Sequence, residues 1–390
     1  MTNARMVGWA HSRFGKSAAP DTEALMAEVM GPALDHAGVP AGDVDAIFVG
    51  CMNNGFSRQD FVGALAGMAM PELARVPATR LENACATGSA ALYAAIDFIE
   101  AGRGDVALVV GVEKMTALPT VEVGDILLGA SYRSEEAEVE GGFAGLFGQI
   151  AQGYFQKHGD QSDALAMIAA KNHANGVHNP YAHMQKAFTF EQCNTVSDRN
   201  PYVAPPLRRT DCSLVSDGAA AIVVASERAA KGLARGVGFR ARTQANDVLA
   251  LSKRDPAAFD GARRAWAGSL DAAGLTLDDL HFVETHDCFT IAELIEYEAM
   301  GLAPRGRGAD VIRDGTTTRD GRLPVNLSGG LKSKGHPIGA TGVSMHVMAA
   351  MQLAGEAPEG MQAARAEIGG VFNMGGASVA NYCSILERVQ

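Results

Sequence analysis

Three short segments of this chain recur later in the same order, and this internal repeat constrains the fold more than any other feature of the sequence. The matched pairs are residues 34–38 (LDHAG) with 270–274 (LDAAG), residues 86–88 (ATG) with 340–342 (ATG), and residues 218–219 (GA) with 376–377 (GA). Stretches that are typical of strands or of small-residue helices follow both copies in corresponding places. Any one match is easily a coincidence among Ala- and Gly-rich segments, but the shared order predicts a duplicated α/β unit.

The spacing of the matches indicates that one repeat is longer than the other. The third pair lies closer together in the sequence than the first two pairs, so the first copy carries an insertion. The segment from about residue 117 to 205 differs from the rest of the chain in composition, with clustered glutamates, a Gly-Gly pair and three histidines. Long insertions in compact folds are usually lids or binding loops. We therefore divide the chain into residues 1–235, which include the insertion, and residues 236–390.

Local patterns place strands and helices in alternation. Strands are predicted over residues 4–10, 46–49 and 108–112, and helices over residues 23–37 and 89–100. At 390 residues the chain is too long for one average core, and its 47% hydrophobic and 20% charged content is typical of a packed globular protein. The sequence thus predicts the α/β class with several packed lobes.

The charge and the cysteines exclude several classes of partner. A formal net charge of -11 argues against a nucleic acid or an anionic membrane, which recruit clustered Lys and Arg. The sequence has no apolar run long enough to span a membrane and no signal-peptide pattern at its start, so we expect a cytoplasmic protein. Its six cysteines form no CxxC pair, which speaks against a disulfide framework and against a metal site.

Cys85 is the first candidate for chemistry. It lies between small residues in the segment Asn83 to Ser89, just before a stretch of helix formers. This places the thiol at a strand-to-helix turn, where a helix N-terminus would lower its pKa and backbone N–H groups can hold an oxyanion. A lone cysteine in such a place also packs well as a small hydrophobic side chain. The position of this motif in the repeat favours the nucleophile.

His336 occupies the corresponding position in the second repeat. It lies in a glycine-bordered loop, residues 335–342 (GHPIGATG), directly before the next helix. If the two halves pack about a pseudo-twofold axis, the two turns face each other, and Cys85 and His336 form a pair of nucleophile and base. The alternative is a histidine that only fixes its own turn by hydrogen bonding.

Two later segments offer further groups to such a site. Residues 285–290 (THDCFT) follow an apolar strand, so His286 and Cys288 lie where ligand sites of α/β sheets collect. A thiol there can be acid and base for a carbon-bound proton, although such residues are also common on surface loops. Gly375 and Gly376 precede the last strand and suit either backbone amides that face a ligand or a tight turn.

Four motifs in order, ENACATGSAA, THDCF, GHPIGATG and a late NMGGA loop, resemble the thiolase family over nearly the whole chain. The opening VG and FGK segments and the HDCF motif resemble the sterol-carrier-protein type of thiolase in particular. The resemblance implies the thiolase fold, in which two βαβαβαββ halves stack as a five-layered αβαβα core and an inserted loop domain covers coenzyme A.

The resemblance also implies roles for these residues. In the family, the residue that matches Cys85 is acylated, and the one that matches His336 activates it and helps bind the thioester oxygen. His286 matches the other part of that oxyanion site, and Cys288 matches the acid/base of the sterol-carrier type. Other thiolases carry a catalytic cysteine where this chain has Asn373. The implied reaction is reversible Claisen condensation of acyl-CoA with acetyl-CoA, or thiolysis of a 3-oxoacyl-CoA, through an acylated Cys85.

Substrates, partners and contacts follow from the same resemblance. Acyl-CoA and CoA are the expected substrates, with no cofactor and no metal, and the expected assembly is a homodimer or a tetramer. Leu146 and Phe147 resemble the segment that lines the pantetheine arm in relatives, and Ser252 is a further candidate contact with CoA. Cys85 and one of Gly375 and Gly376 are candidate backbone donors to a second oxyanion.

Three other functions compete with this interpretation. A thiolase-like CoA-binding subunit of weak activity, which works with a small partner protein, is suggested by Asn373. It is opposed by four intact residues, Cys85, His286, Cys288 and His336. A decarboxylating ketoacyl synthase pairs its cysteine with two histidines, so Cys288 fits it less well. A papain-like hydrolase predicts neither the duplication nor the glycine loops.

Overall fold

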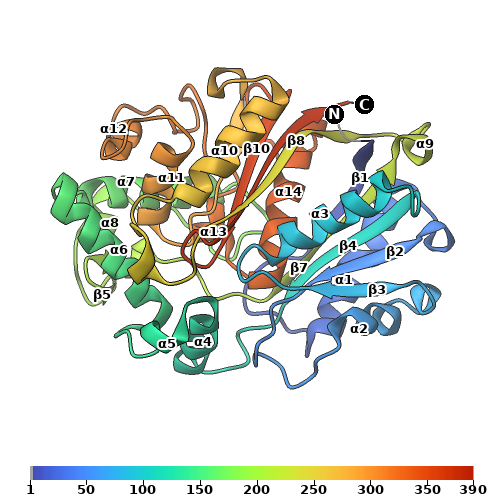
Figure 1. Cartoon of the computed structure of the whole chain (residues 1–390), viewed down its shortest axis with the longest axis horizontal. Coiled ribbons are helices and arrows are strands. Elements are labelled where there is room, and N and C mark those ends of the chain that lie inside the picture. Colours follow the sequence, from blue (N-terminus) through green and yellow to red (C-terminus); the bar gives the residue numbers. More distant parts are fainter. Residues whose placement is uncertain (1–2, 390) are drawn as a thin grey trace.

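The computed structural model describes residues 3–389, and over these residues it shows a mixed α/β molecule (Figure 1). The strands are β1 (Ala4–His11), β2 (Ala46–Gly50), β3 (Ala78–Leu81), β4 (Val106–Glu113), β5 (Tyr202–Ala204), β6 (Leu207–Arg208), β7 (Gly218–Ser226), β8 (Val237–Asn246), β9 (Phe282–Glu284), β10 (Ile368–Gly375) and β11 (Ala380–Arg388). The α-helices are α1 (Thr22–Ala37), α2 (Val62–Ala69), α3 (Thr87–Glu100), α4 (Thr120–Leu127), α5 (Arg133–Glu136), α6 (Gly142–His158), α7 (Ser162–Gly176), α8 (Phe190–Asn194), α9 (Glu227–Ala230), α10 (Asp260–Ala273), α11 (Thr290–Ala299), α12 (Gly308–Arg313), α13 (Gly330–Lys334) and α14 (Ile338–Ala354). The α/β class predicted from the sequence is confirmed.

The order of the strands confirms the internal duplication. Among the described residues, nine strands form one sheet in the order β3-β2-β4-β7-β1-β8-β11-β10-β9. The first half pairs β2 with β4 in parallel, then β7 and β1 antiparallel, and the second half repeats this pattern with β9, β10, β11 and β8. A parallel bridge from Val283 to Val325 takes the place of the pairing between β2 and β3.

The two half-sheets meet at their edges, which the sequence analysis did not anticipate. Strands β1 and β8 pair over a short stretch, with Arg5 opposite Gly238 and Met6 opposite Val237. Because each is the edge strand of its own half, this pairing covers two edges whose backbone groups would otherwise be unpaired.

The layers of the molecule follow from which helices contact which strands. Helices α3 and α14 contact each other and lie between the two half-sheets, since both contact the first half and each also contacts strands of the second half. Helix α1 contacts β1 and β7 from the outer side, and α10 covers β8 and β11 with α11 beside it (Figure 1). This is the expected αβαβα stack. Every residue of α14 from Ile338 to Leu353 is buried, as its small and apolar residues require in a central layer.

Helices α3 and α14 cross where both contain glycine near the N-terminus. A Cβ atom at Gly88 would lie 2.6 Å from the backbone nitrogen of Val343, and one at Gly342 would lie 2.3 Å from the backbone nitrogen of Ser89. Only residues without a side chain permit this contact. The crossing therefore brings the turn before α3 and the turn before α14 into proximity.

The segment between β4 and β7 is mostly helical and packs on the second half. It contains α4 to α8 and the small β5–β6 pair, and α7 contacts α11, α12 and α13. Lys171 of α7 is buried and its Nζ donates to Oε1 of Glu293 in α11 at 2.6 Å. A buried ion pair of this kind fixes the segment against the core, because breaking it would leave a charge without a partner.

A search of the described residues finds no helix that is both long and apolar enough to cross a membrane.

Candidate active site

Cys85 lies in the turn between β3 and α3. The turn contains Ala84 in the left-handed region, with φ 48°, which is strained for a residue with a side chain and common at functional sites. It is held by the backbone N–H of Asn83, which donates to Thr87 Oγ1 at 2.7 Å, and by the Asn83 side chain, which donates to the Tyr382 hydroxyl at 2.8 Å. The turn is therefore rigid, and the Cys85 side chain is 2% exposed.

His336 lies in the loop between α13 and α14, and its ring is held in one tautomer. Its Nδ1 lies 2.6 Å from Thr341 Oγ1, and the Thr341 hydroxyl donates to the carbonyl of Pro337 at 2.9 Å. Because the hydroxyl has a single proton, Thr341 must accept from Nδ1–H. The buried Nε2 of His336 has no partner among the described residues. It is an unprotonated nitrogen that can accept a proton.

His286 follows β9, and its ring contacts Asn373 of β10. The Asn373 Nδ2 lies 2.9 Å from Nδ1 of His286 and donates to the carbonyl of Cys85 at 3.1 Å, while its Oδ1 accepts from Ser89 Oγ at 2.7 Å. These contacts join the His286 loop, the last hairpin and the Cys85 turn. The Nε2 of His286 is buried and, like that of His336, has no partner in the part of the chain that the structure describes.

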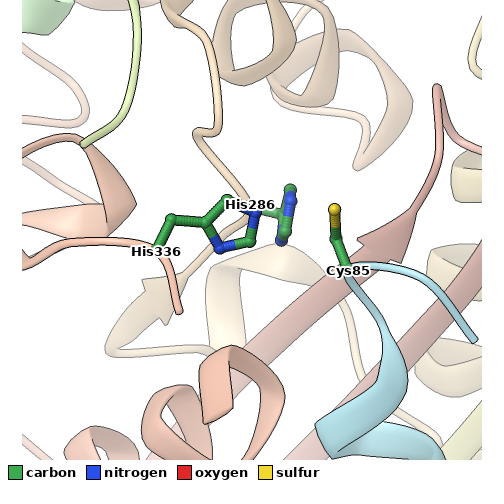
Figure 2. Close-up of side chains that lie close together, drawn as sticks. All are labelled: Cys85, His286 and His336. Carbon is green, nitrogen blue, oxygen red and sulfur yellow. The ribbon is translucent and has the colours of Figure 1, made fainter. Parts of the chain in front are cut away.

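These three residues form one buried cluster at the crossing of α3 and α14. The Sγ of Cys85 and a ring nitrogen from each of His286 and His336 all lie within 4.8 Å of one another. The two imidazole rings are 5.1 Å apart between centroids at an angle of 81°, and Figure 2 shows the thiol beside them. The structure thus brings together residues that are up to 251 positions apart, since 336 minus 85 is 251.

The same spacing would suit a metal ion, but the hydrogen bonds of His286 do not. Cysteine and histidine are common zinc ligands, and a ligating nitrogen must be unprotonated. Because Asn373 donates to Nδ1 of His286, the neutral ring carries its proton on Nε2. The donor set therefore favours proton transfer and hydrogen bonding over metal ligation.

Burial sets the protonation of the cluster. It raises the pKa of Cys85 to about 12, although backbone N–H groups of Gly376 and of Cys85 itself oppose the shift. The backbone N–H groups thus act in the direction expected from the sequence, but the net pKa is raised and not lowered, because desolvation outweighs them. Burial, with the nearby Lys334, lowers the pKa of His336 to about 3, and the pKa of His286 also lies well below its ordinary value. The resting site holds a thiol and two neutral imidazoles.

Cys288 lies beside this cluster on the same loop as His286. It is 3% exposed, and burial together with the neighbouring Cys85 raises its pKa well above the ordinary value. The loop is anchored by Asp287, which accepts from the backbone N–H of Leu331 at 2.6 Å and from Asn172 Nδ2 at 2.7 Å. Asp287 thus ties the His286 loop to α13 and to the inserted segment.

The two late glycines pack against the Cys85 turn. A Cβ atom at Gly375 would lie 2.3 Å from the carbonyl oxygen of Asn83, so the hairpin approaches that closely only without a side chain. Gly376 has φ 63°, and its backbone N–H faces the Cys85 sulfur. A donor in this place can also reach an oxygen on a carbon attached to the sulfur.

An apolar cavity of about 260 Å³ opens onto His336. Its lining includes Phe143, Val203, Leu214, Phe289 and Ile338. The Leu214 carbonyl also accepts a hydrogen bond from the backbone N–H of His336 at 3.2 Å, so the cavity wall and the His336 loop are connected.

The predicted CoA contacts Leu146 and Phe147 are 1% and 0% exposed and do not themselves line this cavity. Phe147 lies directly behind its wall, because its ring centroid is 5.6 Å from that of Phe143 and 4.4 Å from that of Phe289. Ser252 is exposed, and its hydroxyl donates to Glu135 Oε2 at 2.5 Å.

Sequence reasoning missed several residues that hold the site. Buried Glu113 accepts from the backbone N–H groups of Met52 and Gly339 at 2.9 Å each, which ties β2 to the start of α14. Thr341 and Lys334 flank His336 and set its tautomer and its charge. Only the short sequence distance from His336 could have pointed to Thr341 and Lys334. Nothing in the sequence around Glu113 indicates that it contacts the site.

Comparison with known proteins agrees with the motifs. The family model described as thiolase, N-terminal domain, matches residues 5–228, and the model described as thiolase C-terminal domain-like matches residues 243–388. The chain is 35% identical over 383 residues to a protein named acetyl-CoA acetyltransferase from Methanothermobacter thermautotrophicus, which covers 96% of this chain and 97% of that protein.

Two further similarities concern one relative and one solved structure. Sterol carrier protein 2 of Homo sapiens is 33% identical over 300 residues, which cover 72% of this chain and 53% of that longer protein. The solved structure of the Ltp2-ChsH2(DUF35) aldolase aligns with a TM-score of 0.81 over 99% of this chain and 97% of that chain, and its 19% identity shows a common fold. By sequence motifs, by both family models and by fold, this chain belongs to the thiolase family.

Proposed function

We propose that the chain is a thiolase-type acyltransferase that works through an acylated Cys85. The observation that carries this proposal is the cluster itself, in which the Cys85 thiol and one ring nitrogen from each of two buried imidazoles lie within 4.8 Å of one another. Of these two rings, His336 has an Nε2 that can accept a proton and His286 an Nε2 that carries one. Relatives named acetyl-CoA acetyltransferase support the same chemistry.

The acyl-transfer step uses Cys85 and His336. As the sulfur attacks the thioester carbonyl, the thiol proton passes to Nε2 of His336, so no free thiolate has to exist in the resting enzyme. The backbone N–H of Gly376 is placed to donate to the oxyanion that forms on the attacked carbon. The CoA sulfur then leaves and takes the proton from His336, and the acyl group remains on Cys85.

The carbon–carbon step uses Cys288 and His286. In thiolysis, the acetyl-CoA part leaves as an enolate whose oxygen accepts from Nε2–H of His286, and the Cys288 thiol gives its proton to the enolate carbon. The thiol of a second CoA then returns a proton to Cys288 while its sulfur takes the acyl group from Cys85. The departing Cys85 sulfur takes back the proton that His336 holds, so both residues return to their resting forms. Condensation reverses these steps. The raised pKa of Cys288 keeps it a thiol at rest, which is the form that thiolysis needs.

The charges of a second cavity support a place for the CoA phosphates. This cavity of about 490 Å³ is lined by apolar Met184, Phe188 and Leu214 and by the basic residues Lys186, Arg199, Arg209 and Lys332. It shares Leu214 with the apolar cavity that reaches His336. The basic residues of the larger cavity suit the phosphates of the adenosine diphosphate part of CoA. The apolar lining of the smaller cavity suits the pantetheine arm.

Charge reversal tests this placement of CoA. We expect Lys186→Glu with Arg209→Glu to raise the KM for CoA thioesters ~10-fold or more and to leave kcat within about twofold, because phosphate contacts bind ground and transition state alike. The same double change at Arg263 and Arg264 of α10, on the outer layer, is the matched control. An unchanged KM would place the phosphates elsewhere.

Separating the two half-reactions tests the function itself. Acetyl-CoA, acetoacetyl-CoA and longer 3-oxoacyl-CoA esters are offered to the protein, and thioester change and intact mass are followed together. Cys85→Ala should give no adduct with any ester, whereas Cys288→Ala should still become acylated at Cys85 but lose carbon–carbon turnover by ~10²-fold or more. Full turnover of Cys288→Ala would remove its assigned role.

The same experiment decides the alternative. A thiolase-like subunit of weak activity that binds CoA beside a partner protein predicts no adduct in the isolated chain. The buried and aligned cluster favours the enzyme, since such a cluster is costly to keep without use.

A further inference from the structure

Asn373 contacts two members of the cluster but takes no part in the steps above. It is fully buried on β10, and its amide donates to the carbonyl of Cys85 at 3.1 Å while its oxygen accepts from Ser89 Oγ at 2.7 Å. A backbone carbonyl can only accept, so the nitrogen of the amide must be the atom that faces Cys85. The orientation of this amide is therefore fixed by its neighbours.

Because the orientation of the Asn373 amide is fixed, only one neutral tautomer of His286 is compatible with it. The same Nδ2 lies 2.9 Å from Nδ1 of His286, and a nitrogen that faces a donor must be an acceptor. The ring proton then lies on Nε2, the buried atom that has no partner in the described chain. His336 has the opposite arrangement, because Thr341 accepts from its Nδ1–H.

We propose that Asn373 is a positioning residue that holds His286 as a hydrogen-bond donor to the substrate oxygen and prevents it from acting as a second base. This inference rests on the proposed function, because it names what distinguishes the two histidines of that site. Two neighbouring neutral imidazoles are chemically alike, and only their Nδ1 partners make one an acceptor and the other a donor at Nε2. Through the Cys85 carbonyl, the same amide also fixes the distance between this donor and the nucleophile.

The groups around His286 are consistent with a neutral ring. The titratable groups that act on it or lie beside it are His336 from the loop before α14, Lys334 from the end of α13, Glu296 from α11, Cys85 from the turn before α3, and Cys288 from its own loop. His336 and Lys334 both lower its pKa, in addition to burial. The neutral ring carries a single proton, since a second one is unfavourable. It can therefore donate to the substrate oxygen only if that proton lies on Nε2.

The tautomer of the unmodified protein gives the first test. ¹⁵N NMR of protein labelled only in its histidine rings, with His286→Gln used to identify the signals of His286, reports which nitrogen carries the proton. We expect a protonated Nε2 and an unprotonated Nδ1. The reverse assignment, or a mixture of both tautomers, would overturn the proposal. This result does not depend on activity, so it is separate from the success or failure of the proposed function.

The second test replaces the donor by an acceptor of the same shape. In Asn373→Asp a carboxylate oxygen faces His286, and the proton should move to Nδ1. We expect carbon–carbon turnover at neutral pH to fall by ~10²-fold or more with KM changed only a few-fold, while acylation of Cys85 is largely kept. The loss should shrink as the pH is lowered, because a carboxylate partner favours the imidazolium, which carries protons on both nitrogens.

Asn381→Asp is the matched control, since Asn381 is also buried, belongs to the same hairpin and donates to backbone carbonyls without contacting a histidine. It should lower the melting temperature and leave the ¹⁵N signals of His286 unchanged. If Asn373→Asp behaves in the same way, with a loss that does not depend on pH and with unchanged His286 signals, its role is only structural and the proposal fails.

Discussion

Lys334 is a buried cation two residues before His336. It is 1% exposed, its Nζ donates to the hydroxyl of Ser344, and burial lowers its pKa to about 8. Its charge lowers the pKa of both His286 and His336. At the residue scale, burial is the main reason that the base of the proposed reaction stays unprotonated in mild acid, and this lysine adds to that effect.

We predict that Lys334→Met moves the acid limb of Cys85 acylation to higher pH. The sign follows from charge: without the ammonium group, the protonated imidazole is less unfavourable, so the pKa of His336 rises from about 3 towards its ordinary value of 6.5. The wild-type acylation rate should show no loss from His336 until the pH approaches that low value. Rapid-quench measurement of acylation against pH checks both statements.

Lys332→Met is the control for this prediction. Lys332 is also buried, but its Nζ donates to the carbonyl of Cys212, and it does not contribute to the pKa of His336. Because Lys332 also lines the basic cavity, acylation is measured at a saturating concentration of the ester, and there the acid limb of the Lys332→Met variant should stay at the wild-type pH. A shift of equal size in both variants would show that packing, and not the charge of Lys334, is responsible.

At the scale of elements, the site depends on how α3 crosses α14. Both helices begin at the turns that carry Cys85 and His336, so their separation sets the distance between nucleophile and base. Glu113 at the end of β4 adds a second constraint, because it binds backbone groups of both halves. The geometry of the site is thus a property of packed helices and not of flexible loops.

We predict that Gly88→Ala destabilises the fold and impairs acylation. A Cβ atom there would lie 2.6 Å from a backbone nitrogen of α14, which must move, and overpacking of this kind costs ~1–3 kcal/mol of unfolding free energy. Denaturant unfolding measures the loss of stability, and intact mass measures acylation.

Gly153→Ala in α6 is the matched change. Nothing lies within 4 Å of its added Cβ, so the better helix propensity of alanine should stabilise the protein by about 0.5–1 kcal/mol. Gly88→Ala with wild-type stability would contradict the tight crossing.

At the scale of the whole molecule, β3 ends the sheet on one side and has no further strand beside it within residues 3–389. The adjoining α2 is preceded by Phe61, which is 79% exposed, and carries Met68, which is 66% exposed. Free strand edges and large exposed apolar side chains are typical of contact surfaces. If the chain forms the expected homodimer or tetramer, we expect β3 and α2 to be part of the contact.

We predict that the chain sediments as a dimer or a larger oligomer. The double variant Phe61→Glu with Met68→Glu should weaken this association by ~30-fold or more, as expected for the loss of two apolar anchors. Val121→Glu is the control, because Val121 is 85% exposed on α4, away from that edge. A wild-type protein that sediments as a monomer at micromolar concentration would exclude the interface.

The sequence by itself determined the class of the fold, its duplication and the motifs of the site. Strands alternate with helices because apolar periodicity is local, and helix α1 ends at Gly38 because a left-handed cap is encoded by one residue. The repeat predicted that the turns of Cys85 and His336 face each other, since a duplicated fold packs its copies about an axis. Family motifs named the same four residues that the structure places in and beside one buried cluster.

Only the tertiary structure decided the properties that depend on which distant segments touch. Burial reversed the expected net pKa shift of Cys85, and packing buried Leu146 and Phe147 outside the set of residues that line the apolar cavity. The role of Asn373 arises from its contacts with residues 87 and 288 positions away, in His286 and Cys85, which no local pattern records. Residue types set what chemistry is available, but solvent exclusion and hydrogen-bond partners set the protonation of each group, and both exist only once the chain has folded.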